Sequence, residues 1–275
     1  MPYEIKETLI TIKDIGLTFG DKVILKGVNA EVKDIVRPGC TQGQVVGILG
    51  PSGTGKTQLS RILAGLQEPT SGEVLISQDS TRRLRVRNGL VGMVAQHYPL
   101  FKHRTVLGNL IIAAQQTGLT AQQAKDKSYD YLKRFDLPEK AHDYPSQLSG
   151  GQRQRIAIIQ QLLCSEHFLV FDEPTSGLDP IMKDRVCELI NQVALLDERN
   201  TIFIISHDIP AVAKIADTIW LIGRDRDENG KPIAGSKIQK EYNLIERDLC
   251  WQPGIDSTVK FADFVNEVKH KFVDL

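Results

Sequence analysis

A glycine-rich stretch of the chain carries residue types suited to binding phosphate and a divalent cation. It runs Gly50-Pro51-Ser52-Gly53-Thr54-Gly55-Lys56-Thr57 and matches the pattern GxxxxGK[ST]. Its glycines let backbone N–H groups point at an anion, and the helix expected after it adds a positive dipole. Lys56 suits the β- and γ-phosphates, and the Thr57 hydroxyl suits Mg²⁺. All eight residues of this loop are therefore predicted to bind a nucleoside triphosphate.

A second stretch, Phe168-Leu169-Val170-Phe171-Asp172-Glu173, is an apolar run that ends in two carboxylates. Such a run is typical of a buried strand, so Asp172 would stand at the strand end, where parallel sheets bind ligands. Asp172 is predicted to hold Mg²⁺, directly or through water. Glu173 is the candidate general base for an attacking water. An Asp-Glu pair after a strand can also be a helix cap, but the phosphate-binding loop favours catalysis.

The apolar spacing predicts which elements position these residues. The fold class is α/β, with a mostly parallel sheet as the core of a P-loop NTPase. Residues 8–36 alternate apolar and polar on both sides of a turn at 19–21, which predicts an antiparallel β-subdomain. A helical pattern without strands predicts an α-helical subdomain inserted at about 97–165. Strands are expected at residues 45–49, 73–77, 90–95, 168–172, 202–205 and 218–222.

The last fifty residues differ in character from the rest of the chain. Residues 224–237 are polar and rich in turn formers. Apolar residues at 261, 264, 265, 268 and 272 fall at helical spacing, with Ser257 or Thr258 as the cap. The predicted division is an ATPase domain at 8–222 and a C-terminal extension at 223–275, which holds an amphipathic helix near 258–272. The apolar stripe is expected to pack on the body, with a partner contact as the alternative.

Composition limits the class of protein. The chain has 275 residues, 41% of them hydrophobic, and a formal net charge of zero. Zero net charge argues against a nucleic-acid binder driven by bulk charge. An apolar run long enough to span a membrane is absent, and residues 1–10 lack an apolar signal core. The four cysteines form no CxxC pattern. These features predict a cytosolic protein with reduced thiols and at most a peripheral membrane role.

Between the two chemical stretches lies Leu148-Ser149-Gly150-Gly151-Gln152. With it, the chain resembles the ATP-binding subunits of ABC transporters over about residues 8–222. This segment matches the signature motif of that family, and its amides would lie at a helix N-terminus suited to an anion. The resemblance implies that Ser149, Gly150, Gly151 and Gln152 bind the γ-phosphate of ATP held by the other subunit of a head-to-tail dimer.

The resemblance also implies roles for four further residues. Gln96 would contact Mg²⁺ and the attacking water, and His207 would be the switch histidine near the γ-phosphate. Asp179 would act in the segment that crosses the dimer interface, and Phe19 would stack on adenine, where tyrosine is usual. The chain departs from the family pattern by a small insertion at residues 37–43 and by the lack of the usual arginine at 158–162.

The function implied is an ATPase whose cofactors are ATP and Mg²⁺ and which drives a separate membrane permease. Residues 96–101 and the helical block would form the permease docking groove. A single cassette without a fused membrane domain resembles bacterial importers, and residues 96–101 and 105–110 resemble the polar amino-acid uptake branch. The implied partners are an identical or paired ATPase subunit, the permease and an extracytoplasmic solute-binding protein. The implied location is the cytoplasmic face of the cell membrane.

The alternative is a soluble ABC ATPase with a non-transport role. Those that act on ribosomes usually carry two cassettes, whereas this chain has one set of motifs. Those that act on DNA insert a long coiled coil, whereas the 90 residues from 58 to 147 contain no long heptad run. The signature motif and His207 also disfavour a P-loop kinase or GTPase. No nucleic-acid partner is expected.

Overall fold

The computed structural model describes residues 3–37, 42–77, 83–95, 98–165, 167–252 and 254–275. Strands run through much of this part of the chain, and their bounds follow. They are β1 (Glu4–Phe19), β2 (Lys22–Val36), β3 (Gln44–Leu49), β4 (Ser71–Ser77), β5 (Arg83–Arg85), β6 (Gly92–Val94), β7 (Phe168–Asp172), β8 (Thr201–Ser206), β9 (Thr218–Arg226) and β10 (Pro232–Asn243).

These strands form one mixed sheet. In the described residues its order is β5-β4-β1-β2-β10-β9-β3-β8-β7-β6. The segment from β9 to β6 is parallel throughout, because β3 pairs in parallel with both β8 and β9, and β7 with both β8 and β6. The strands β1, β2, β4 and β5 pair antiparallel and form the N-terminal β-subdomain. The predicted α/β fold with a mostly parallel core is confirmed.

Helices cover both faces of the parallel segment. They are α1 (Lys56–Leu63), α2 (Val106–Gln115), α3 (Ala121–Arg134), α4 (Gly150–Cys164), α5 (Pro180–Ala194), α6 (Ile209–Ala213) and α7 (Val259–Asp274), with short 3₁₀ turns at Pro138–Lys140, Pro145–Gln147 and Ile255–Ser257.

The two layers of the core follow from the alternation of side chains along each strand. In β8, Phe203 and Ile205 belong to one buried cluster, which also contains apolar residues of α1 and of the β-subdomain. Their neighbours Ile202 and Ile204 belong to the other cluster, which contains apolar residues of α4, α5, α6 and α7. The parallel strands are therefore buried on both sides, which explains why their sequences are continuous apolar runs.

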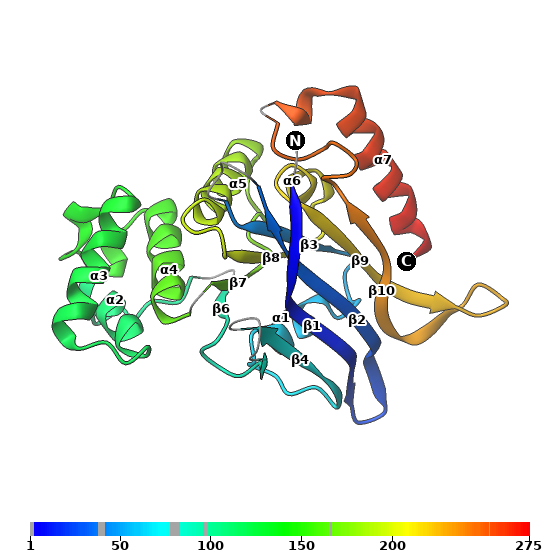
Figure 1. The fold of residues 1–275 in the computed structure, drawn as a ribbon, viewed down its shortest axis with the longest axis horizontal. Helices are drawn as coiled ribbons and strands as arrows, with labels where there is room; N and C mark the ends of the chain where they lie inside the picture. Colours follow the sequence, from blue (N-terminus) through cyan, green and yellow to red (C-terminus); the bar gives the residue numbers. More distant parts are fainter. Residues whose placement is uncertain (1–2, 38–41, 78–82, 96–97, 166, 253) are drawn as a thin grey trace.

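The helices α2, α3 and α4 form an arm beside the sheet. Figure 1 shows this arm at the left of the molecule, away from the β-subdomain. Side-chain caps begin each helix: Thr105 accepts a hydrogen bond from Gly108, Thr120 from Gln123, and Ser149 from Gln152. The arm therefore lies where the uninterrupted helical pattern of the sequence predicted it.

The region after residue 222 contains more strand than the sequence indicated. Residues 224–237 were expected to be polar and turn-rich, but β9 continues to Arg226 and β10 begins at Pro232. The boundary predicted after residue 222 thus falls inside β9. The strand β10 escaped notice because its apolar residues are sparse and pairing with β9 supplies its hydrogen bonds. The strand β5 and the helix α6 were also missed, because neither is long enough to show a period.

The amphipathic helix at the end of the chain is α7, and its apolar stripe packs on the body. Phe261, Phe264, Val265 and Val268 are all buried. Thr258 caps the helix by accepting a hydrogen bond from the Phe261 amide. The prediction that this stripe faces the body is confirmed.

A buried carboxylate ties the C-terminal extension to the sheet. Asp217 accepts hydrogen bonds from the Val45 amide, the Arg37 guanidinium and the Trp251 indole. The Arg37 guanidinium also stacks on the Trp251 ring, 3.3 Å from its centroid. Burial raises the pKa of Asp217 to about 6, against the lowering effect of Arg37 and of the Val45 and Trp251 hydrogen bonds. Three segments distant in the chain meet at this group.

The raised pKa of Asp217 predicts a pH-dependent contribution to stability. A carboxyl whose pKa is higher in the folded than in the unfolded state stabilises the fold at low pH, and this contribution is lost as the pH rises through about 6. The Asp217→Asn variant lacks this titration. Between pH 4.5 and 7 its free energy of unfolding should therefore gain about 2 kcal/mol relative to wild type. Urea unfolding at both pH values measures the difference, and parallel pH profiles would contradict it.

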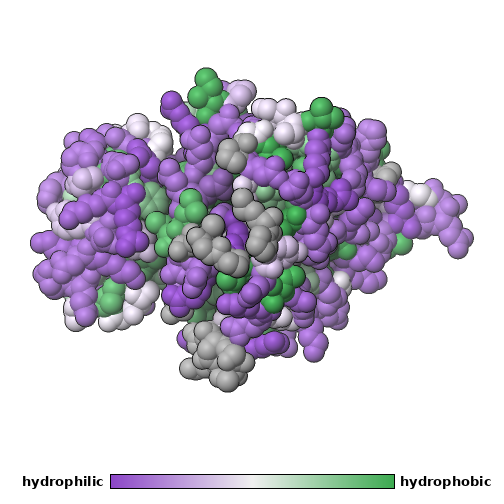
Figure 2. Space-filling model, turned by 45° about the horizontal axis from the view of Figure 1, so that its top comes forward, coloured by the Kyte–Doolittle hydropathy of each residue, from purple (hydrophilic) through white to green (hydrophobic). Residues whose placement is uncertain are grey.

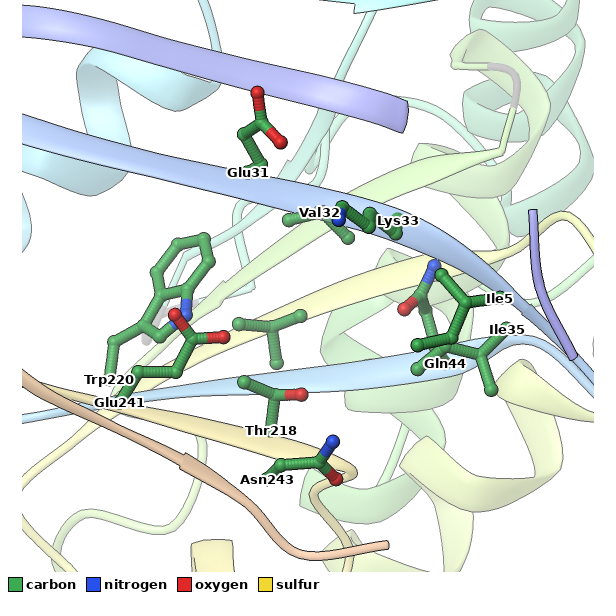
Figure 3. A pocket seen from close by; sticks show the side chains of 11 residues that line it. Ile5, Glu31, Val32, Lys33, Ile35, Gln44, Thr218, Trp220, Glu241 and Asn243 are labelled. Atoms are coloured by element: carbon green, nitrogen blue, oxygen red, sulfur yellow. The ribbon is translucent and has the colours of Figure 1, made fainter. Parts of the chain in front are cut away.

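A cavity of about 330 Å³ lies where β2 separates from β9 and β10 (Figure 3). Its lining includes Gln44 and Val46 of β3, near the start of that strand, whereas the phosphate-binding loop follows the strand's end. The Trp220 indole N–H in its wall is buried and has no hydrogen-bond partner in the described residues. The cavity is thus remote from the residues predicted to do chemistry.

The surface, the helices and the cysteines bear on the membrane and thiol properties expected from the sequence. The face drawn in Figure 2 is mostly hydrophilic, with hydrophobic side chains in small separate groups. Among the described residues, no helix is both long and apolar enough to cross a membrane. Cys164, Cys187 and Cys250 are free thiols, and Cys40 lies outside the described residues.

Candidate nucleotide site

Three motifs that are far apart in the sequence follow neighbouring strands of the parallel segment. The phosphate-binding loop (residues 50–57) follows β3, Asp172 ends β7 with Glu173 directly after it, and His207 follows β8. The strand ends are in register, since Leu49 pairs with Ser206 and Asp172 with Ile205. The carboxyl ends of parallel strands form the edge at which α/β proteins bind ligands. The topology thus brings the predicted phosphate, metal and catalytic groups together.

The loop has a backbone that only glycine tolerates at several positions. Gly53 and Gly55 have φ angles of 83° and 82°. A Cβ on Gly55 would also lie 2.8 Å from Cγ2 of Ile24, and a Cβ on Gly50 would lie 2.4 Å from the Ile222 carbonyl oxygen. These close approaches hold the loop between β9 and the β1–β2 hairpin. The loop then leads directly into α1, whose N-terminal dipole favours an anion.

Lys56 is the buried cation of the loop. Its Nζ donates to the carbonyl oxygens of Gly50 at 2.8 Å and Pro51 at 2.9 Å. Burial lowers the pKa of this ammonium, whereas the negative charges of Glu173 and Asp172 raise it. Lys56 therefore interacts electrostatically with both carboxylates, and its ammonium group contacts the backbone of the loop that would hold the phosphates.

Asp172 has the features of a ligand for a hard cation. Its Oδ1 atom is buried and has no hydrogen-bond partner in the described residues. Burial and the charge of Glu173 raise the pKa of Asp172, and a hydrogen bond from Thr57 is among the opposing effects. A buried carboxylate oxygen without a partner, beside a threonine hydroxyl, fits the oxygen ligands that Mg²⁺ prefers. Gln96, also expected to contact the ion, lies outside the described residues.

Glu173 is held in one position by its neighbours on β8. Its backbone N–H donates to the Ile205 carbonyl at 2.8 Å, and its carboxylate accepts from the Ser206 hydroxyl at 3.2 Å. Nδ1 of His207 lies 2.9 Å from Oε2 of Glu173. The φ angle of Glu173 is 51°, a left-handed conformation that is rare for a side-chain-bearing residue. Strain of this kind is concentrated at functional sites. The arrangement suits a positioned general base.

Phe19 stands at the end of β1, on the hairpin that borders the loop. Its side chain is 48% exposed, and Ile24 of the same hairpin contacts Gly55. An aromatic ring left this exposed is available for stacking on a planar base. Phe19 therefore lies on the hairpin that contacts the loop, and its stacking on adenine stays a prediction.

The signature segment begins α4, on the arm, and lines a different cavity. Ser149 caps the helix: its hydroxyl accepts from the Gln152 amide at 3.3 Å, and its own N–H donates to Oε1 of Gln152 at 2.9 Å. The cavity, of about 540 Å³, lies between the first turns of α4 and residues of α5 such as Met182 and Arg185. The described residues of the phosphate-binding loop are not among those that line it.

The local geometry of the described residues does not require glycine at either of the two signature glycines. Neither Gly150 nor Gly151 has a positive φ angle. A Cβ built on either would meet no described atom within 4 Å. By contrast, Gly55 of the phosphate-binding loop has both a positive φ and a close neighbour. The glycines of α4 therefore leave open space above a helix N-terminus whose N–H groups suit an anion.

Two further contacts were not evident from the sequence. Asp179, predicted to lie at a subunit interface, caps α5 by accepting a hydrogen bond from the Met182 amide at 3.0 Å. Arg224, which no motif singled out, donates from Nη2 to the carbonyl oxygen of Gly53 at 3.2 Å. Nothing in the sequence marks Arg224, because the contact joins residues 171 positions apart.

Comparisons with known proteins were made once these positions were established. Residues 35–176 match the family model described as "ABC transporter". The arginine transport ATP-binding protein ArtM of Bacillus subtilis is 34% identical over 251 residues, covering 88% of this chain and 100% of ArtM. The glutamine transport ATP-binding protein GlnQ of Escherichia coli is 34% identical over 230 residues, covering 82% of this chain and 92% of GlnQ.

The fold has counterparts among solved structures. That of cbiO1 from Clostridium perfringens, part of the ABC transporter complex cbiONQ, superposes with a TM-score of 0.68 at 24% sequence identity. The match covers 88% of this chain and 90% of cbiO1. At this identity the likeness shows the fold alone.

Proposed function

Since the chain belongs to the ABC transporter family, as an importer-type ATPase subunit that uses ATP and Mg²⁺, we propose how its own residues divide that work. One observation carries the proposal. The phosphate-binding loop, Asp172, Glu173 and His207 converge at one sheet edge, whereas the signature segment faces a separate cavity. One chain thus holds two half-sites, and a complete site needs a second chain.

In the first half-site, the loop amides and Lys56 bind the phosphates, and Phe19 stacks on the adenine. Asp172 and Thr57, with Gln96, would hold Mg²⁺, and the bound ion would neutralise phosphate charge. Glu173 accepts a proton from the attacking water. His207 and Ser206 orient its carboxylate through the hydrogen bonds described above. For Lys56, Asp172 and Glu173, these roles agree with the burial, hydrogen bonding and charge given above.

In the second half-site, Ser149, Gly150, Gly151 and Gln152 bind the γ-phosphate of ATP that the other chain holds. The open space above Gly150 and Gly151 supports this role, because their own chain makes no use of it. Asp179 lies at the start of α5, whose next residues border the same cavity. We infer a head-to-tail dimer in which two ATP molecules are enclosed.

The Gly151→Asp variant tests the second half-site. A carboxylate at this position has room in the monomer, and the positive end of the helix dipole stabilises it. The free energy of unfolding should therefore be unchanged or slightly higher. In the dimer, however, the carboxylate of residue 151 would repel the γ-phosphate. We expect MgADP binding by the isolated chain to be retained, while ATP hydrolysis falls at least about tenfold and dimerisation with ATP is lost. Calorimetry measures the binding, and light scattering the dimer.

The matched control is Ala121→Asp, which adds the same charge to the first turn of α3 on the same arm. It should leave dimerisation with ATP and hydrolysis unchanged. If the Gly151→Asp variant dimerises and hydrolyses ATP as wild type does, the signature segment of this chain does not contact ATP on a second chain.

A groove on the arm suits the permease. It has a volume of about 410 Å³, and Phe101 beside it is 47% exposed. Its lining combines apolar residues with Lys102 and Arg153, which suits a short segment with apolar and acidic side chains. The lining residues are Tyr98, Pro99, Leu100, Lys102, Pro145, Ser146 and Arg153.

The same proposal extends to cargo and location. The relatives named above are an arginine and a glutamine transport ATP-binding protein, which supports import of a polar amino acid. An extracytoplasmic solute-binding protein would deliver it, and this chain would act at the cytoplasmic face of the permease. Uptake of labelled arginine and glutamine by cells with and without the intact chain measures this. A soluble non-transport ATPase is the less supported alternative.

A further inference from the structure

An arginine outside every sequence motif contacts the phosphate-binding loop. Arg224 lies near the end of β9, and its Nη2 donates to the Gly53 carbonyl at 3.2 Å. Gly53 stands in the middle of the loop, where its φ of 83° turns the backbone. A donor fixed on the sheet therefore holds the carbonyl of the residue whose conformation determines where the loop amides point.

The positive charge of Arg224 has no carboxylate partner among the described residues. Its Nε atom is buried without a hydrogen-bond partner there. The adjacent Asp225 is paired instead with Lys237, at 2.7 Å. The charge of Arg224 thus adds to that of Lys56 at the loop and favours an anion.

The end of the C-terminal helix braces the segment that carries Arg224. The Arg224 amide donates to the Leu275 carbonyl at 3.4 Å, and Nη2 of Arg226 donates to the Val273 carbonyl at 3.3 Å. A Cβ on Gly223 would lie 2.6 Å from Cδ2 of Leu275, so the two backbones approach closely. Figure 1 shows α7 and the chain end beside the β9–β10 region.

We propose that Arg224 is a positioning residue of the phosphate-binding loop, and that α7 holds it in place, so that the C-terminal extension helps to set the affinity for nucleotide. The inference rests on the nucleotide site proposed above. It assigns Arg224 a role in binding and none in the chemical step, because its contact is to the loop backbone.

The test is calorimetric titration of the full chain with MgADP. The Arg224→Gln variant should raise the Kd for MgADP about threefold to tenfold, because it loses one partly exposed charged hydrogen bond. The KM for ATP should rise by the same factor, while kcat stays within about twofold of wild type. The Arg224→Lys variant keeps the charge and one donor, and should recover most of the affinity. The Gly223→Ala variant, which displaces Leu275, should raise the Kd in the same direction.

The matched control is Lys231→Gln, which removes the same charge from the exposed turn between β9 and β10. An unchanged Kd in Arg224→Gln, or a change equal to that of the control, would overturn the positioning role. An unchanged Kd in Gly223→Ala would overturn the role of α7. Failure of wild type to bind MgADP would instead refute the nucleotide site itself.

Discussion

The Glu173→Gln variant is expected to hydrolyse ATP about 10²–10⁴-fold more slowly than wild type while still binding ATP. The amide has nearly the shape of the carboxylate and can still accept the hydrogen bond from Ser206. It cannot take a proton from water, however. The steady-state rate with saturating MgATP, compared with MgADP affinity, separates loss of the base from loss of binding.

The same variant should accumulate the closed dimer. In the proposed head-to-tail dimer, hydrolysis would reopen the pair of chains, so blocking hydrolysis should leave ATP enclosed between the two half-sites. Light scattering with and without saturating MgATP should show a dimer only with ATP. Glu246→Gln, an exposed carboxyl on the C-terminal extension, is the matched control and should hydrolyse ATP at the wild-type rate. A Glu173→Gln variant that stays monomeric at saturating ATP would count against the head-to-tail dimer.

The Lys56→Met variant is expected to bind MgADP and MgATP about 10–150-fold more weakly, because it loses a charged hydrogen bond to phosphate. Methionine keeps the length and apolar part of the side chain, so the loop should keep its packing. What is lost is the buried cation that donates to the carbonyls of Gly50 and Pro51 and would donate to phosphate. Calorimetry with each nucleotide measures the change.

Combining the two changes gives a stricter test. The Lys56→Met/Glu173→Gln double variant should no longer dimerise with ATP, because the proposed dimer requires ATP held by the loop. The control Lys127→Met removes an exposed lysine from α3 and should bind nucleotide as wild type does. Wild-type affinity in Lys56→Met would mean that the nucleotide lies elsewhere.

Most of the nucleotide half-site could be predicted because its determinants are local. The loop from Gly50 to Thr57 is one continuous segment whose glycines specify its backbone. Asp172 was predicted at a strand end because the apolar run before it is as long as the buried strand itself. In both cases a few adjacent residues determine the conformation, and local rules suffice.

The sequence by itself determined which chemical groups are present and the strand or helix end at which each lies. Only the tertiary structure decided which of them meet. The contact between Glu173 and His207 depends on β7 and β8 being neighbours in register, and the contact between Arg224 and Gly53 on β9 lying beside β3. The openness above Gly150 and Gly151 is likewise a property of packing. Strand order and open space arise from long-range pairing and burial, which leave no local pattern in the sequence.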